Sequence, residues 1–341
     1  MSNVTLKDIA AELGVSLATV SKALNDKPDV SERVKSMVRR IAKEKGYQPN
    51  YFASNLALSK PTNLIGYIIP SAGDLFTPGI TKAVEDRIFT SGYNMLLGQS
   101  KNEFQRERQL INDFIRKRVS GLILIAAPGN GNIEYYKKII KALPVVFIDQ
   151  HMGIEANYVL TNDKEVSCQA IEHLIELGHR RILVLGGMKG AGTTEHRLEG
   201  CRLAMKNAGL ERDWLLEAQI GFQEDSAYDA LAKMEREGVA YSAMLCLSNR
   251  VAYGAIRFFR DRGLAIPEDI SLIGFANDSD GASIRSLPGC TIVRQPTYEY
   301  GEKAVELLYS IIENGNSGSY REMVLPSYLQ IGNSTASPAL G

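Results

Sequence analysis

The feature that most constrains this chain is a pair of short amphipathic segments, over residues 6–13 and 17–25, with a very short connection between them. Apolar residues recur at helical spacing in both segments, and Thr5 and Ser16 are suitable N-caps. Gly14 ends the first segment only two residues before the cap of the second. Two helices joined so closely must cross steeply, so we predict a helix-turn-helix.

The outward side of the second segment suits a helix that enters the DNA major groove. It carries small hydroxyls, small apolar side chains and one long cation, which can approach phosphates and base edges without hindrance. The outward residues are Ser16, Leu17, Ala18, Thr19, Ser21 and Lys22, with Leu17, Ala18 and Lys22 at the positions that read bases.

A third helix is expected between its cap Ser31 and Gly46. The formal net charge of the chain is zero, yet residues 1–60 hold ten Lys and Arg against six Asp and Glu. The remainder holds 29 against 33. A basic head on a mildly acidic body fits a protein whose head alone contacts phosphate.

After Thr62 the pattern changes to short apolar runs that alternate with amphipathic helices. This alternation predicts doubly wound parallel sheets, and the number of repeats favours two sheets over one. Residues 158–163 and 286–295 are expected to be crossovers between the two lobes. The expected strands are 64–70, 93–98, 121–126, 145–149, 181–186, 216–220, 243–247, 270–275 and 327–332. The expected helices are 79–91, 103–118, 132–142, 163–177, 195–208, 225–237, 249–262 and 297–313.

Several stretches resemble the lactose/galactose-repressor (LacI/GalR) family of bacterial transcription regulators. In the head they are residues 14–25 (GVSLATVSKALN), Val30-Ser31 and 46–50 (GYQPN); in the body they are 177–182 (LGHRRI), 254–257 with 262–264, and 266–275 (IPEDISLIGF). The resemblance implies an α/β fold class, with a helix-turn-helix head and a hinge helix before two lobes of the periplasmic-binding-protein type. It also adds Thr5, Asn25 and Ser31 to the expected DNA contacts.

The resemblance implies the following domain borders. The head would span 1–48, the hinge helix and linker 49–61, and the effector-binding and dimerisation body 62–341. Lobe 1 would comprise about 62–160 and 294–323, and lobe 2 about 161–293 and 324–335. In the hinge, Leu56 would be the apolar wedge in the DNA minor groove, Ala53 the small residue at the approach of two hinge helices, and Asn50 a further DNA contact.

The family binds a small effector between its lobes, usually a sugar or nucleobase. Asp149 matches a carboxylate that accepts ligand hydroxyls, although a loop-capping role explains it nearly as well. Arg197 matches an arginine that reaches into the cleft, and Phe76 and Phe222 match aromatic platforms that could equally be core residues. The full expected effector set is Phe76, Asp149, Arg197, Phe222, Ser248, Asn249, Asn277 and Gln295.

Two positions depart from the family pattern. Ser248-Asn249 stands where Asn-Asp is usual, and Ala276-Asn277 stands where two polar residues led by Asp are usual. The loss of two carboxylates weakens the expectation of a simple hexose. We therefore expect an effector that is anionic, drawn by Arg197, or poor in hydroxyls; the absence of any effector is the remaining alternative.

The sequence carries no catalytic motif. The glycine-rich run 186–192 follows a strand but has Glu195 where a dinucleotide fingerprint needs a third glycine. Neither a phosphate-binding loop nor a nucleophile elbow occurs. The four Cys and four His residues show no metal-ligand spacing. We expect no enzyme activity, no cofactor and no metal.

These observations predict a cytoplasmic, homodimeric transcriptional regulator that acts as a repressor on a pseudo-palindromic operator. A small molecule in the cleft would gate DNA binding. One alternative is a regulator of the same fold whose cleft is not ligand-gated and which responds to a protein partner. The other is a stand-alone small-molecule binding protein, which predicts a signal peptide and no head. No apolar segment suggests secretion or a membrane span, and the tail after 332 has no heptads for a tetramer.

Overall fold

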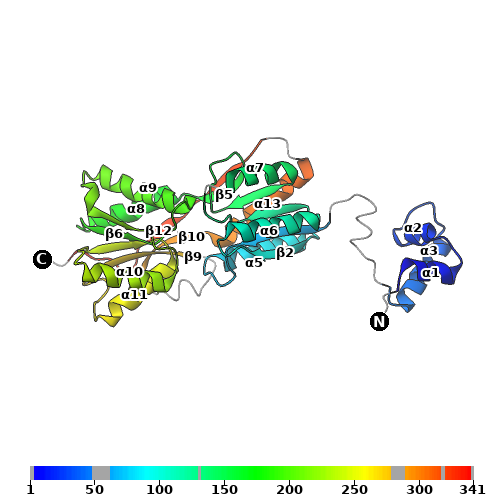
Figure 1. The fold of residues 1–341 in the computed structure, drawn as a ribbon, viewed down its shortest axis with the longest axis horizontal. Coiled ribbons are helices and arrows are strands. Elements are labelled where there is room, and N and C mark those ends of the chain that lie inside the picture. The colour runs from blue at the N-terminus through cyan, green and yellow to red at the C-terminus, as the bar shows by residue number, and fades with distance from the viewer. Residues whose placement is uncertain (1–3, 48–61, 130–131, 278–288, 316–318, 339–341) are drawn as a thin grey trace. The chain divides into compact units, whose positions relative to one another are not determined.

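The computed structural model describes residues 4–47, 62–129, 132–277, 289–315 and 319–338. The chain divides into two compact units, residues 1–62 and 63–341. The first unit is helical, and the second contains two sheets with helices on their faces (Figure 1).

The first unit folds into three helices around a small core of its own. They are α1 (Leu6–Leu13), α2 (Leu17–Leu24) and α3 (Glu32–Glu44). The helix-turn-helix prediction is therefore confirmed, and so is the third helix. The buried apolar residues that close the core between the helices are Ile9, Ala10, Val20, Ala23, Val30, Val38, Ile41 and Ala42.

The local signals that predicted the helix ends act as expected. The Asp8 carboxylate accepts hydrogen bonds from the backbone N–H of Thr5 at 2.7 Å and from its hydroxyl at 2.8 Å. Gly14 ends α1 in the left-handed conformation, with φ of 65°. The Ser16 hydroxyl accepts the N–H of Thr19 at 3.1 Å at the start of α2. Each helix end is thus determined by residues within one turn of it.

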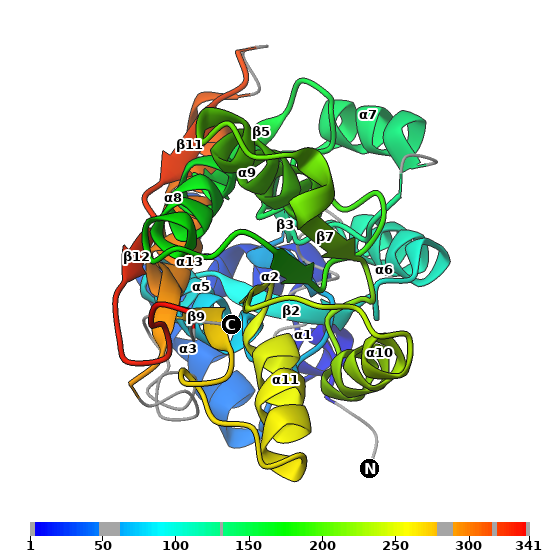
Figure 2. The same cartoon turned by 90° about the vertical axis from the view of Figure 1, so that its left-hand side faces the viewer.

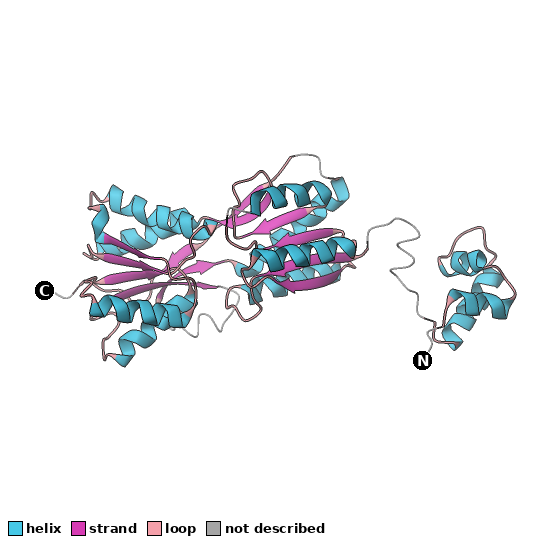
Figure 3. Cartoon of the chain, viewed as in Figure 1, coloured by secondary structure: helices cyan, strands magenta, loops and turns pink. Residues whose placement is uncertain are grey.

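The second unit contains two six-stranded sheets in which parallel pairing predominates (Figure 3). The first has the order β11-β5-β4-β3-β1-β2 and the second β12-β10-β9-β8-β6-β7. The strands of the first sheet are β1 (Leu64–Ile69), β2 (Asn94–Gln99), β3 (Gly121–Leu124), β4 (Val145–Ile148), β5 (Asn157–Thr161) and β11 (Glu322–Leu325). Those of the second are β6 (Ile182–Leu185), β7 (Leu215–Ala218), β8 (Ala243–Cys246), β9 (Ser271–Asn277), β10 (Thr291–Gln295) and the antiparallel β12 (Tyr328–Gln330).

Helices cover both faces of each sheet, which explains why the central strands are continuous apolar runs. The first sheet packs against α5 (Thr77–Thr90) and α13 (Thr297–Asn314) on one face, and against α6 (Phe104–Arg116) and α7 (Ile133–Ala142) on the other. The second sheet packs against α8 (Asp163–Glu176) and α9 (Gly192–Asn207), and against α10 (Glu224–Arg236) and α11 (Asn249–Asp261) (Figure 2). A short 3₁₀ helix, Arg212–Trp214, precedes β7.

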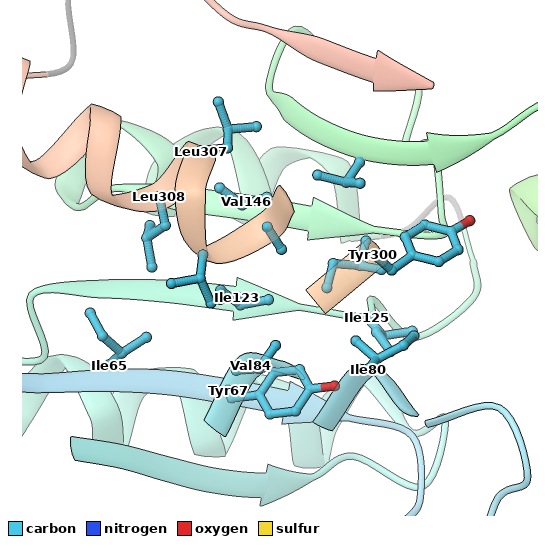
Figure 4. Close-up of a cluster of buried hydrophobic side chains, with 14 of the residues drawn as sticks. Ile65, Tyr67, Ile80, Val84, Ile123, Ile125, Val146, Tyr300, Leu307 and Leu308 are labelled. Atoms are coloured by element: carbon cyan, nitrogen blue, oxygen red, sulfur yellow. The ribbon is translucent and has the colours of Figure 1, made fainter. Parts of the chain in front are cut away.

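Figure 4 shows how the first sheet is closed by helices that are distant in sequence. Ile80 and Val84 of α5 and Tyr300 and Leu308 of α13 lie over the strands, and all four side chains are fully buried. The last long helix therefore completes the first lobe, as expected, while β12 joins the second sheet.

The two segments expected to be crossovers also contain strands that the sequence did not predict, and each crossing follows directly after its strand. Residues 157–161 form β5 and residues 291–295 form β10, both inside the sheets. Both strands contain polar residues, so neither forms the continuous apolar run that predicts a buried strand. Asn157 is buried but bonds to the carbonyl of Val145 and the N–H of Arg321, and Thr161 accepts the hydroxyl of Tyr300 at 3.1 Å. Tertiary partners thus make polar residues compatible with an interior strand.

The edge strand β11 was not expected either, because its four residues alternate between exposed and buried positions and are too few to form a clear pattern. The chain passes from one sheet to the other at Asn162, at Pro296 and between Leu325 and Tyr328. These crossings lie a few residues beyond the expected lobe borders, because each preceding strand runs up to its crossing. Asn162 accepts the N–H of Ser327 at 2.7 Å, which ties two of the crossings together.

Candidate DNA-binding and effector-binding sites

The predicted DNA-contacting residues of the head lie on its surface around α2. Thr5, Ser16, Leu17, Ala18, Lys22, Asn25 and Ser31 are exposed, and Thr19 and Ser21 are half-buried. Leu17 keeps 44% of its surface exposed at the first turn of α2. An exposed leucine at that place is available to an apolar contact such as a thymine methyl group.

Lys22 has an intramolecular partner that the sequence pattern did not reveal. Its ammonium forms an ion pair with the Asp29 carboxylate in the turn after α2, and this interaction lowers the pKa of Asp29. Both side chains remain about half exposed, at 52% and 53%. The cation is therefore accessible from solvent, but it must leave or share Asp29 when it contacts DNA.

The three expected hinge contacts, Asn50, Ala53 and Leu56, lie outside the described residues.

A pocket lies where the two sheets of the second unit face each other. It is formed at the carboxyl ends of parallel strands, the usual ligand position in such sheets. All eight residues of the expected effector set line it: Phe76, Asp149, Arg197, Phe222, Ser248, Asn249, Asn277 and Gln295.

Other lining residues were not expected, among them Asp74, Gln150, Arg250 and Phe275. Gln150 follows β4 and Arg250 belongs to the first turn of α11, so their place after a strand is the signal that could have found them. Asp74 lies several residues past β1, and nothing in its local sequence places it in the pocket.

Arg197 is held by groups of its own lobe. Its Nε donates to Asp163 at 2.9 Å, and its Nη1 donates to the Leu247 carbonyl at 2.7 Å. The guanidinium carbon also lies 4.0 Å from the centroid of the Phe275 ring. Arg197 and Asp163 are both buried, with side chains 7% and 4% exposed. Asp163 therefore already neutralises the charge of Arg197, and an anionic effector would have to displace that carboxylate.

Asp149 is the buried carboxylate of the pocket. It follows β4 with a left-handed φ of 68°, a conformation that Asp tolerates better than most residues. Burial raises the pKa of Asp149 to about 7, although the charge of Arg197 acts in the opposite direction. Its Oδ1 has no hydrogen-bond partner, and neither does the buried Nε2 of Gln295. The pocket therefore contains one unfilled acceptor and one unfilled donor.

Hydrogen bonds join the two lobes around this pocket. Arg250 donates to the carbonyl of Gly73 at 3.1 Å, and the Asn277 side chain donates to the carbonyl of Leu75. The backbone N–H of Gly192 donates to the Gln150 side chain at 3.0 Å. Asn277 thus connects the two lobes by a hydrogen bond and also lines the pocket.

The remaining predicted residues have mixed surroundings. Phe76 packs edge-on against Tyr300, with ring centroids 6.0 Å apart, and Phe222 packs against the core of the second lobe. The Ser248 hydroxyl caps α11 by accepting the N–H of Val251. These side chains have structural contacts while they line the pocket.

Neither a metal site nor a membrane span is found in the part of the chain that the structure describes. Among those residues, no group of three or more His, Cys, Asp or Glu could hold a metal ion. None of the described helices is long and apolar enough to cross a bilayer.

A helix-turn-helix unit joined to a two-lobed body with a pocket at its strand ends defines a ligand-responsive DNA-binding regulator. The family model "Bacterial regulatory proteins, lacI family" matches residues 5–50, and "Periplasmic binding protein-like domain" matches 171–335. Catabolite control protein A of Priestia megaterium is 32% identical over 311 residues, which covers 90% of this chain and 92% of that protein. The chain therefore belongs to the LacI family of transcriptional regulators.

Solved structures extend the likeness to nearly the whole chain. The lac repressor dimer bound to operator and the anti-inducer ONPF is 25% identical, has a TM-score of 0.83, and aligns with 98% of this chain and 100% of its own. The complex of the transcriptional regulator CelR with cellobiose is also 25% identical, has a TM-score of 0.71, and aligns with 97% and 100%. These relatives are regulators, which confirms the expectation that the chain is not an enzyme.

Proposed function

We propose that the protein is a cytoplasmic repressor that binds a pseudo-palindromic operator as a homodimer. The observation that carries this proposal is the exposed polar face of α2 in a helix-turn-helix with its own core. Each subunit would place α2 in one major groove, and Leu56 would enter the central minor groove. Ala53 would lie where the two hinge helices approach, and Asn50 would be a further DNA contact. The operator-bound dimer of the similar lac repressor supports this arrangement.

Lys22→Ala is expected to weaken specific operator binding by about 1–3 kcal/mol and to relax preference at one base pair in each half-site. The ammonium supplies a donor to a base edge that alanine lacks. Binding to operator variants and to random DNA, measured by fluorescence anisotropy at fixed salt, checks this. An equal loss on both kinds of DNA would identify Lys22 as a phosphate contact instead.

Asp29→Asn is the matched control for Lys22. It releases the lysine and removes a negative charge beside the DNA, so affinity should rise while the lysine remains. In the Lys22→Ala background the same change should give a smaller gain, because no ion pair is left to release.

We further propose that the pocket binds a small neutral molecule that carries a ring and both donor and acceptor groups. The unfilled Asp149 Oδ1 calls for a ligand donor, and the unfilled Gln295 Nε2 calls for a ligand acceptor. Phe76 and Phe222 offer apolar surface to a ring. Asp74 and Asp149 line the pocket and disfavour an anionic ligand. The charge of Arg197 does not offset them, because it is already paired with Asp163. The cellobiose complex of the similar regulator supports a sugar-like ligand.

Isothermal titration with neutral mono- and disaccharides, including cellobiose, and with their phosphate esters tests the ligand class. We expect a neutral compound to bind and its phosphate ester to bind far more weakly. Affinity should rise as the pH increases through about 7, because ionised Asp149 accepts a hydrogen bond from the ligand best. Below pH 7 the carboxyl group is protonated, and its proton must be lost before the ligand can donate to it. Asp149→Asn should abolish this pH dependence. Tighter binding of the ester would contradict a neutral effector, and no binding by any compound would contradict sugar gating.

A further inference from the structure

A second buried carboxylate lies in the first lobe, outside the pocket lining. Glu107 belongs to the first turn of α6 and is fully buried. Its Oε2 accepts the backbone N–H of Ala127 at 2.6 Å, and its Oε1 accepts the hydroxyl of Tyr136 at 2.5 Å. Both donors are neutral groups, so no cation bonds to this carboxylate in the described part of the lobe.

The burial of such a carboxylate costs free energy, so a role for its position is to be expected. A buried carboxylate without a counter-ion loses its hydration, and its hydrogen bonds must offset that loss. Burial raises the pKa of Glu107 to about 7, while the bonds from Tyr136 and Ala127 act in the opposite direction. A leucine or phenylalanine there would avoid a buried charge, but it would leave the Ala127 N–H and the Tyr136 hydroxyl without this acceptor.

The bond to Ala127 connects Glu107 with the pocket wall. β3 ends at Leu124, and the ladder continues only as far as the N–H of Ile125, which bonds to the carbonyl of Ile68 at 2.9 Å. Two residues later the N–H of Ala127 donates to the Glu107 carboxylate instead of to a backbone carbonyl of a neighbouring strand. Ile125 and Pro128, which flank this amide, both line the pocket. The carboxylate of Glu107 therefore supports the segment where the ladder no longer does.

We propose that Glu107 is a positioning residue of the effector site: its carboxylate holds the Ala127 amide, and through it the Pro128 wall, against α6 and α7. Tyr136 of α7 orients the carboxylate by donating to its other oxygen. The hydrogen bond exists without a ligand, whereas its role in binding rests on the function proposed above for the pocket.

The state of the Glu107 proton decides how well it can hold the wall. The ionised carboxylate accepts both bonds, whereas the protonated acid must place its own hydrogen and so weakens one of them. The titratable groups on the elements packed on this side of the sheet include Tyr135 and Tyr136 of α7 and Tyr158 of β5, all with raised pKa values. Arg108 on α6 lies over the ring of Tyr135, 5.3 Å from its centroid. The tyrosines stay neutral near pH 7, so Glu107 titrates there without them. Asp149 in the pocket also has a pKa of about 7, and a Glu107→Gln variant separates the two carboxylates.

The full-length protein labelled with ¹⁵N-alanine gives a direct test without any ligand. The Ala127 amide, assigned with an Ala127→Gly variant, should change its chemical shift between pH 5 and 9 with a midpoint near the Glu107 pKa of about 7. In Glu107→Gln, which keeps an acceptor of the same shape, the shift should not titrate. Glu103→Gln, at the exposed N-cap of α6, should titrate like the wild type. A flat wild-type titration, or one that persists in Glu107→Gln, would overturn the proposal.

A second measurement addresses the wall itself. The neutral sugar that binds best to the wild type should bind Glu107→Gln about tenfold more weakly, the scale of one charge-assisted hydrogen bond. Unchanged affinity in a variant whose amide no longer titrates would overturn the positioning role. If none of the sugars binds the wild type, the effector assignment fails, while the amide titration still decides whether Glu107 holds Ala127.

Discussion

Arg197→Met is expected to destabilise the second unit by about 3–5 kcal/mol, the usual cost of breaking a buried ion pair from one side. The change leaves the Asp163 carboxylate only 4% exposed and without its cation. It also removes the charge that favours ionised Asp149. Trp214, the single tryptophan, lies in the same lobe, so urea unfolding followed by its fluorescence measures the loss.

A double variant separates the charge effect from lost packing. Arg197→Met with Asp163→Leu removes both charges, and replacement of a buried pair by apolar residues is often neutral. The double variant should therefore recover most of the stability that the single variant loses. If the single variant unfolds at the wild-type urea concentration, Asp163 is not left as an uncompensated charge. The same reasoning predicts that loss of Arg197 reduces DNA binding through instability, rather than removing only the response to a ligand.

Gly200→Ala is expected to destabilise the protein by about 1–3 kcal/mol, although the same change in an ordinary helix stabilises it by up to about 1 kcal/mol. A Cβ at this position would lie 2.1 Å from the Lys164 carbonyl oxygen and 3.0 Å from the Cys168 nitrogen. Both obstacles are backbone atoms of α8, so relief requires α8 and α9 to move apart. Thermal unfolding by circular dichroism measures the difference.

Glu199→Ala provides the control at the adjacent position of α9. Glu199 is exposed and pairs with Lys164 at 3.2 Å, a surface ion pair of small value. Its replacement should change stability by less than about 0.5 kcal/mol. A stabilised Gly200→Ala variant would mean that the two helices are not in the close contact described. Gly254 and Gly301 occupy equivalent crossings, where a Cβ would lie 2.2 Å from Glu224 O and 2.5 Å from Ile80 O.

The sequence by itself determined those features that depend on neighbouring residues. Thr5, Gly14 and Ser16 act within one helical turn, so the helix-turn-helix could be predicted from local patterns. The apolar runs of β3 and β4 are buried on both faces, and their composition alone shows this. The pocket residues could be predicted in part, because the ends of parallel strands meet at one edge and the family resemblance indicated which positions to examine.

The tertiary structure decided what depends on partners distant in the chain. Arg197 and Asp163 are 34 residues apart, and only the packing of α8 on α9 reveals that the arginine charge is already neutralised. The strands β5 and β10 carry polar residues with partners in other segments, such as Tyr300 for Thr161 and Thr335 for Thr291, so their composition did not identify them as strands. Glu107 looks like an ordinary acidic residue near a helix start, and burial against Ala127 and Tyr136 gives it another role. The physical reason is the same in each case: hydration, charge compensation and hydrogen bonding depend on three-dimensional surroundings, whereas helix capping and apolar periodicity depend on adjacent residues.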